Sequence, residues 1–125
     1  GYAAECAKNL MKKQGVESGI VNAAGDLTTW GRQPNGKEWT IGIADPDAKD
    51  KPFSYLNISD MAVATSGNYE KFVVIDGKRY SHTIDPKTGL PVSGIKSVTI
   101  ICPNAEIAAA MATPITVMGV KVGIN

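Results

Sequence analysis

The chain has 125 residues, of which 43% are hydrophobic and 20% charged, values typical of a soluble globular domain that argue against disorder. Thirteen Lys and Arg against twelve Asp and Glu leave a net charge of +1, which gives no general attraction to nucleic acid or to an anionic membrane. No apolar run approaches the roughly 18 to 20 residues that a transmembrane helix needs, and two cysteines, Cys6 and Cys102, are too few for a disulfide scaffold, so we expect each to be a buried free thiol.

Apolar spacing predicts an amphipathic helix over residues 2–14, followed by Gly15 as a left-handed C-terminal cap. A turn at 24–26 should join the first two strands, and Pro34-Asn35-Gly36-Lys37 is a second turn signal. After the third strand we expect a polar loop that runs to Pro52. The strands predicted in this half of the chain are 20–23, 27–30, 38–43, a segment that begins at Phe53, and 61–65.

In the second half, Asp76-Gly77 predicts a hairpin between strands at 72–75 and 79–82, because this pair favours positive φ. Residues 97–102 are rich in β-branched side chains and predict another strand. Asn104 is a candidate N-cap for a helix that starts at 105, which Pro114 should kink or divide near 110–113. Gly119 is a second candidate C-cap.

The order of these elements, one helix, six or seven strands and a second helix, predicts a single α+β domain. We expect a mostly antiparallel or mixed sheet with two main helices packed on it. The strands and helices do not alternate regularly, which disfavours a Rossmann fold.

The densest cluster of reactive side chains lies at 79–91. It contains the one histidine of the chain, His82, which is a candidate general base or phosphate ligand. The alternative is a strand-end histidine bonded to a backbone group, and that reading is favoured for a lone histidine. Asp85-Pro86 fits either an acid that braces the loop or a simple turn.

Three further segments are candidates with plain structural alternatives. Residues 64–69 end a strand in hydroxyl side chains and glycine, which suits an anion or a flat ring but also fits a tight loop. Residues 22–26 end in one acid and fit a hairpin corner. Thr113 lies four residues after Ala109, on the same helix face, where an acid at 109 would complete a pair of oxygen ligands for Mg²⁺. Alanine cannot coordinate a metal, so this segment also reads as a buried small-residue helix.

Five strings of the sequence, taken in order, resemble the ApbE family of FAD:protein FMN transferases. They are Val-Asn-Ala-Ala-Gly-Asp at 21–26, Trp-Thr-Ile-Gly-Ile-Ala-Asp-Pro at 39–46, Ala-Thr-Ser-Gly-Asn-Tyr-Glu at 64–70, Tyr-Ser-His-Thr-Ile-Asp-Pro-Lys-Thr-Gly at 80–89 and Ala-Ala-Ala-Met-Ala-Thr at 108–113. The resemblance covers nearly the whole chain and implies an ApbE-like α+β fold.

The resemblance implies a Mg²⁺-dependent transfer of FMN from FAD to a threonine or serine of an acceptor protein, with AMP as the other product. Some similar proteins hydrolyse FAD to FMN and AMP instead. A non-catalytic FAD-binding module and a domain that binds no flavin stay open as alternatives.

The matching positions imply roles for individual residues. His82 would contact the phosphate or the acceptor hydroxyl, and Asp85 would brace its loop. Thr113 and the main-chain carbonyl of Ala3 would bind the metal. Ala109 stands where the family pattern has an aspartate ligand, so Mg²⁺ binding and transferase activity should be impaired. The residues implied to form the FAD pocket are Gly25, Asp26, Thr65, Ser66, Gly67, Tyr69 and His82.

The chain begins with Gly1 inside a segment that resembles an internal family motif, and we expect residues 1–125 to be the truncated C-terminal core of a longer protein. By family, that protein would be extracytoplasmic or periplasmic, with a lipid anchor as one option. A homo-oligomer or a swapped dimer stays open, because truncation exposes strand edges.

Overall fold

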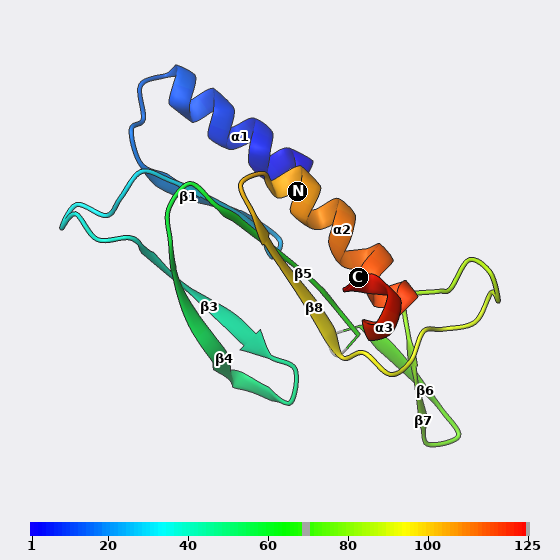
Figure 1. Cartoon of the computed structure of the whole chain (residues 1–125). Coiled ribbons are helices and arrows are strands. Elements are labelled where there is room, and N and C mark those ends of the chain that lie inside the picture. The colour runs from blue at the N-terminus through cyan, green and yellow to red at the C-terminus, as the bar shows by residue number, and fades with distance from the viewer. Residues whose placement is uncertain (69–70, 125) are drawn as a thin grey trace.

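The computed structural model of the chain describes residues 1–68 and 71–124 (Figure 1). Three helices and eight strands lie within these ranges. The helices are α1 (Tyr2–Lys13), α2 (Ala105–Met118) and α3 (Val120–Gly123), and the strands are β1 (Gly19–Ala23), β2 (Asp26–Trp30), β3 (Trp39–Asp45), β4 (Ala48–Ile58), β5 (Ala62–Gly67), β6 (Phe72–Ile75), β7 (Lys78–Ser81) and β8 (Ser97–Cys102). None of the described helices is long and apolar enough to cross a membrane.

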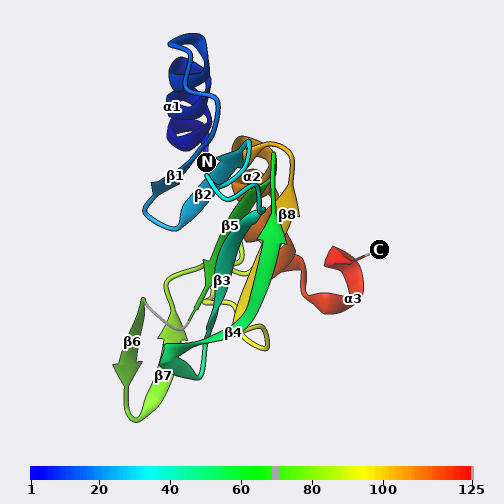
Figure 2. The ribbon, with the colours of Figure 1, turned by 90° about the vertical axis from the view of Figure 1, so that its left-hand side faces the viewer.

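The centre of the molecule is a four-stranded antiparallel sheet with the order β1-β2-β5-β8. The remaining strands form two separate hairpins, β3–β4 and β6–β7. In Figure 1 the helices α1 and α2 lie along one side of this sheet and the β3–β4 hairpin lies on the other. Figure 2 shows the β6–β7 hairpin projecting from the end of the molecule opposite α1. The expected α+β fold with two main helices packed on an antiparallel sheet is confirmed.

Small side chains let α2 approach the sheet closely. Ala105, Ala108 and Ala112 lie three and four residues apart on one helix face, and each is at most 2% exposed. Ala62 and Ala64 of β5, the strand against which α2 packs, are equally buried. Because alanine extends only one carbon from the backbone, the helix and the strand meet with little side-chain volume between them.

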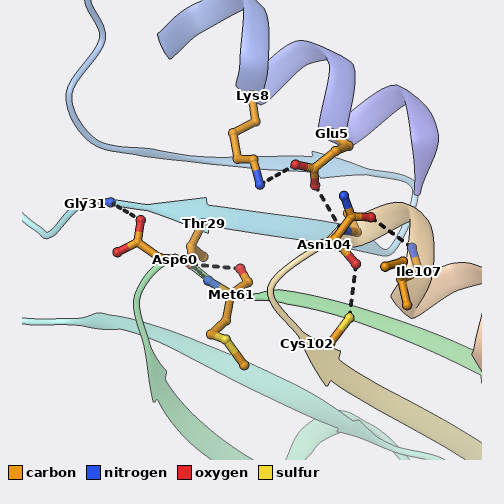
Figure 3. A network of polar contacts seen from close by, with 10 residues as sticks. Glu5, Lys8, Thr29, Gly31, Asp60, Met61, Cys102, Asn104 and Ile107 are labelled. Atoms are coloured by element: carbon orange, nitrogen blue, oxygen red, sulfur yellow. Dashed lines mark hydrogen bonds and ion pairs between the residues drawn. The ribbon is translucent and has the colours of Figure 1, made fainter.

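A buried ion pair on α1 holds the start of α2 (Figure 3). Glu5 accepts a hydrogen bond from the Ala105 N–H at 2.9 Å and pairs with Lys8. The side chains of Glu5 and Lys8 are only 11% and 10% exposed. The first N–H groups of a helix have no partner within it, and a carboxylate there also interacts favourably with the helix dipole. Glu5 therefore joins the N-terminal helix to the first turn of α2.

Most local signals of the sequence are found in the structure. Helix α1 ends before Gly15, which has φ +87°. Asn104 caps α2 by accepting a hydrogen bond from the Ile107 N–H at 3.0 Å, and Gly119 at its other end has φ +79°. Asp76 and Gly77 both have positive φ and turn β6 into β7, as predicted.

Three expectations were wrong, and one of the two alternatives at Pro114 is excluded. The polar stretch before Pro52 is strand from Ala48 onward, because it pairs with the end of β3 across an irregular register in which Ala44 faces Pro52. Helix α2 is not divided at Pro114, since it continues to Met118, and α3 follows; the kink stays a prediction. The described residues contain eight strands rather than six or seven. Both cysteines are free, but Cys6 is exposed and Cys102 half-buried, so neither is the buried thiol that was expected.

The Glu5 anchor predicts a specific pH dependence of stability. Although burial opposes its ionisation, hydrogen bonds from Lys8 and from the Ala105 N–H lower the pKa of Glu5 below its ordinary value. A lowered folded-state pKa stabilises the fold above the unfolded value, about 4.3, and this contribution is lost as the pH falls through the folded value. Glu5→Gln should lower the free energy of unfolding at pH 7 by about 2 kcal/mol, because it leaves Lys8 buried without its partner.

The measurement is urea unfolding at several pH values, with Glu17→Gln as the control because Glu17 is exposed. The difference between the parent chain and the Glu5 variant should shrink as the pH falls from 5 to 3. Equal stabilities of the two variants at pH 7 would show that Glu5 does not anchor α2.

Candidate functional site

A cavity of about 570 Å³ opens beside the central sheet. This volume lies within the range of typical small-ligand pockets. The β1–β2 turn, β3, β5, α2 and the segments on either side of the β6–β7 hairpin contribute to it. Its described lining consists of Asn22, Ala24, Gly25, Asp26, Leu27, Ile41, Gly42, Ile43, Ala44, Val63, Ala64, Thr65, Ser66, Gly67, Lys71, His82, Ala109, Ala112 and Thr113.

Helix α2 presents one of its faces to the cavity because another is packed on β5. Ala108 and Ala112 are buried four residues apart. Ala109 and Thr113 each lie one residue further along, about 100° around the helix, and both line the cavity. Ala109 and Thr113 therefore share a helix face, as their spacing predicted. This face lines a cavity, whereas the alternative interpretation expected a buried helix of small residues.

The turn between β1 and β2 forms one wall of the cavity with its backbone and short side chains. Ala24 and Gly25 have φ values of +54° and +99°, and the Asn22 Oδ1 accepts a hydrogen bond from the Gly25 N–H at 2.9 Å. Two consecutive residues with positive φ are typical of the tightest hairpin turns. Asp26 follows at once, and its carboxylate contacts the amino group of Gly1.

Strand β5 forms a second wall with short side chains. Thr65, Ser66 and Gly67 all line the cavity, and β8 holds this end of β5 in register through the pairs Thr65–Thr99 and Gly67–Ser97. The hydroxyl groups of Thr65 and Thr99 lie 2.9 Å apart. Hydroxyl groups and glycine at the end of a strand leave polar atoms accessible to a bound ligand.

His82 is both a cavity residue and a strand-end histidine. It directly follows β7 and lines the cavity, while its ring Nδ1 lies 2.9 Å from the carbonyl oxygen of Lys71. A carbonyl oxygen can only accept a hydrogen bond, so Nδ1 must carry the proton. In the neutral ring, Nε2 is then left with its lone pair available for a ligand. The functional and structural interpretations of His82 are therefore compatible.

The acidic and basic side chains of the described lining are Asp26, Lys71 and His82. Asp26 is the one carboxylate among them, Ala109 offers no ligand atom, and no three His, Cys, Asp or Glu side chains cluster anywhere in residues 1–68 and 71–124. Mg²⁺ prefers carboxylate oxygens in octahedral geometry. The described donors therefore do not fit a tight magnesium site.

Two of the described residues implied by the family resemblance, Asp85 and Ala3, are not brought to this cavity. Asp85 is not among its lining residues; its carboxylate accepts a hydrogen bond from the Lys87 N–H at 2.8 Å, which closes a local turn. Ala3 is an exposed residue of α1 and does not line the cavity either. Tyr69 lies outside the described residues.

The structure also adds lining residues to which the motifs assigned no role. Ile41, Gly42 and Ile43 belong to a strand whose alternation predicted burial without saying what lies against it. Lys71 belongs to no motif, and only its place before the β6–β7 hairpin brings it near His82.

Comparison with known proteins decides the relationship of the chain. A model of the ApbE family matches residues 1–125. The chain belongs to the ApbE family. A protein of Klebsiella pneumoniae named FAD:protein FMN transferase is 36% identical over 121 residues, which are 95% of this chain and 35% of that protein. The Escherichia coli K12 protein of the same name is also 36% identical, over 95% of this chain and 34% of its own length.

Solved structures agree with this assignment. The crystal structure of the ApbE protein of Thermotoga maritima superposes with a TM-score of 0.87 at 39% identity and covers 94% of this chain and 38% of that one. The apo form of the flavinyl transferase ApbE of Pseudomonas stutzeri gives 0.81 at 35% identity, over 98% and 38% of the two chains. The chain thus has the ApbE fold and spans little more than a third of these relatives.

The contact between His82 and the Lys71 carbonyl predicts which nitrogen holds the proton. In alkaline solution, where imidazole is neutral, the ring should be protonated at Nδ1. Long-range ¹H–¹⁵N correlation spectra report this directly, and the chain has one histidine, so its signals need no assignment. A ring protonated mainly at Nε2 would contradict the contact.

Proposed function

We propose that this chain carries the flavin-nucleotide site of an FAD:protein FMN transferase. The single observation that supports the proposal best is that one cavity gathers residues from all five strings that resemble the family, among them Asp26, Ile43, Thr65, His82 and Thr113. These residues come from separate elements spread over 88 positions of the sequence, counted from 26 to 113. The names of the relatives supply the reaction.

The reaction itself is a displacement at phosphorus. The hydroxyl oxygen of a threonine or serine in the acceptor protein forms a bond to the phosphorus on the riboflavin side of the FAD pyrophosphate. The bond from that phosphorus to the bridging oxygen breaks, and AMP leaves with the bridging oxygen. The hydroxyl proton must be taken up by a base. Positioning and charge neutralisation dominate the catalysis of such transfers.

In this proposal His82 acts through Nε2, since Nδ1 is occupied by the Lys71 carbonyl. A neutral ring would accept the proton of the acceptor hydroxyl, and a protonated ring would donate a hydrogen bond to a phosphate oxygen. The Lys71 side chain would supply positive charge on the same side of the cavity. Asp85 would act on the ring only indirectly, by fixing the turn at 85–90.

Water in place of the acceptor hydroxyl would give FMN and AMP. A further candidate function is a flavin-binding module without catalysis. The metal ligands around Ala109 favour it, because the described lining of the cavity lacks a second carboxylate. These functions share the bound ligand and differ in turnover, so they are separated by measuring AMP release from the flavin-bound chain.

The first prediction concerns the flavin site. Gly25→Ala should weaken FAD binding at least fivefold, because alanine is strained at φ +99° and the distorted turn lines the cavity. Gly77→Ala is a matched control: Gly77 has φ +74° in the same kind of hairpin turn, and it is not a lining residue. Both variants should lose about 1 kcal/mol of stability, but only the first should lose affinity in a titration of flavin fluorescence.

Equal FAD affinity in the two variants would place the flavin elsewhere. Failure of the parent chain to bind FAD at all would refute the proposed function for this chain.

The second prediction concerns the metal. Ala109→Asp should strengthen Mg²⁺ binding at least tenfold in isothermal titration, because it adds a second carboxylate beside Asp26 and Thr113 at one cavity. Ala110→Asp is the control, because residue 110 is exposed on the same helix and does not line the cavity. The parent chain should bind Mg²⁺ weakly and release little AMP from FAD. Tight Mg²⁺ binding by the parent, or equal gains in both variants, would contradict the role given to position 109.

A further inference from the structure

Asn68 occupies the point at which the end of β5 meets the loop that carries His82. Its Oδ1 accepts hydrogen bonds from the Ser81 hydroxyl at 2.5 Å and from the Thr83 hydroxyl at 3.2 Å. These two residues are the immediate neighbours of His82 in the chain. One amide oxygen therefore fixes the backbone on both sides of the histidine.

The other groups of Asn68 bind the segment that precedes β8. Its Nδ2 donates to the Ile95 carbonyl at 3.1 Å, and its backbone N–H donates to the Lys96 carbonyl at 2.9 Å. Because the Ile95 oxygen can only accept, the amide orientation is fixed by its partners, with the nitrogen toward Ile95 and the oxygen toward the hydroxyls. Asn68 is thus held rigidly by the segment that leads into β8.

The contacts continue within the loop. The Ser81 hydroxyl also accepts a hydrogen bond from the Thr83 N–H at 2.9 Å, and the Thr83 carbonyl accepts one from the Val92 N–H at 2.9 Å. Thr83 is 8% exposed, whereas His82 between these two anchors is exposed and lines the cavity. Hydrogen bonds therefore fix the half-buried Ser81 and the buried Thr83, and His82 between them is exposed to the cavity.

We infer that Asn68 is a positioning residue that orients the His82 ring toward the cavity. Asn68 does not line the cavity itself, so it acts through the loop and not on a ligand. The fixed loop places Nδ1 of His82 against the Lys71 carbonyl, and this contact leaves Nε2 available. The catalytic meaning of this arrangement rests on the proposed function, but the orientation of the ring does not.

The test is the protonation state of the single histidine in Asn68→Ala, measured in the full 125-residue chain in alkaline solution. Loss of the shared acceptor should lower the ratio of Nδ1–H to Nε2–H tautomers about fivefold, the effect expected from the loss of one typical hydrogen bond. Asn68→Asp keeps the acceptor oxygen for both hydroxyls but loses the hydrogen bond to the Ile95 carbonyl, so it should recover part of the parent ratio. Asn104→Ala is the matched control, because it removes an asparagine whose side chain accepts its hydrogen bond from the Ile107 N–H at the start of α2.

If Asn68 only stabilises the fold, Asn68→Ala and Asn104→Ala should both lower the melting temperature and both leave the tautomer ratio unchanged. This result would overturn the inference. If Asn68→Ala does not fold, Ser81→Ala removes one of the two converging hydroxyls and should lower the same ratio. FAD is added as a separate step. If the parent chain does not bind FAD, the proposed function fails, while the tautomer ratios still decide the role of Asn68.

Discussion

The close packing of α2 on β5 is the constraint on which the site depends. Ala62 and Ala64 of the strand and Ala105, Ala108 and Ala112 of the helix are all at most 2% exposed. Because this packing fixes the rotation of the helix, the adjacent residues Ala109 and Thr113 line the cavity. A larger side chain at any of the buried positions would have to move the helix, and such overpacking typically costs about 1 to 3 kcal/mol. The walls of the cavity would shift with the helix.

Polar contacts fix the position of α2 along the strand, which the alanine contacts alone do not define. Alanine contacts are short but offer little shape to define a position along the strand, whereas Glu5 binds the first N–H of α2 and thereby sets where the helix starts. Asn68 has the same kind of role at the opposite end of β5, where it joins the strand to the His82 loop. The site lies between these two anchors. The sequence assigned no role to either side chain, although Asn68 lies within the candidate segment 64–69.

Local structure could be predicted where a few neighbouring residues decide it. The Asp76-Gly77 turn, the Asn104 cap and helix α1 all depend on contacts within a few residues of sequence. The start of strand β4 at Ala48 could not be predicted, because its first residues are polar and become a strand only by pairing with β3. Pro114 costs α2 one hydrogen bond, but it is exposed and the tertiary packing of the flanking alanines maintains the helix.

The candidate site shows the same division. The motifs predicted Asp26, Thr65, His82 and Thr113 as pocket residues, and the fold brings them to one cavity. Motifs could not indicate Lys71, since its place beside His82 arises from the hairpin that separates them in sequence. They also could not show that the carboxylate of Asp85 is engaged in its own turn. Long-range geometry, and not residue type, decided these cases.

We propose that a flavin nucleotide binds between α2, β3 and the end of β5. The most direct measurement is an isotope-filtered NOE experiment on the ¹³C-labelled chain with unlabelled FAD. We expect contacts from the nucleotide to the methyl groups of Ala109, Thr113 and Ile43, which line the cavity. Contacts confined to Val73 and Val74 of the exposed β6–β7 hairpin, or to the apolar residues of α3, would contradict it.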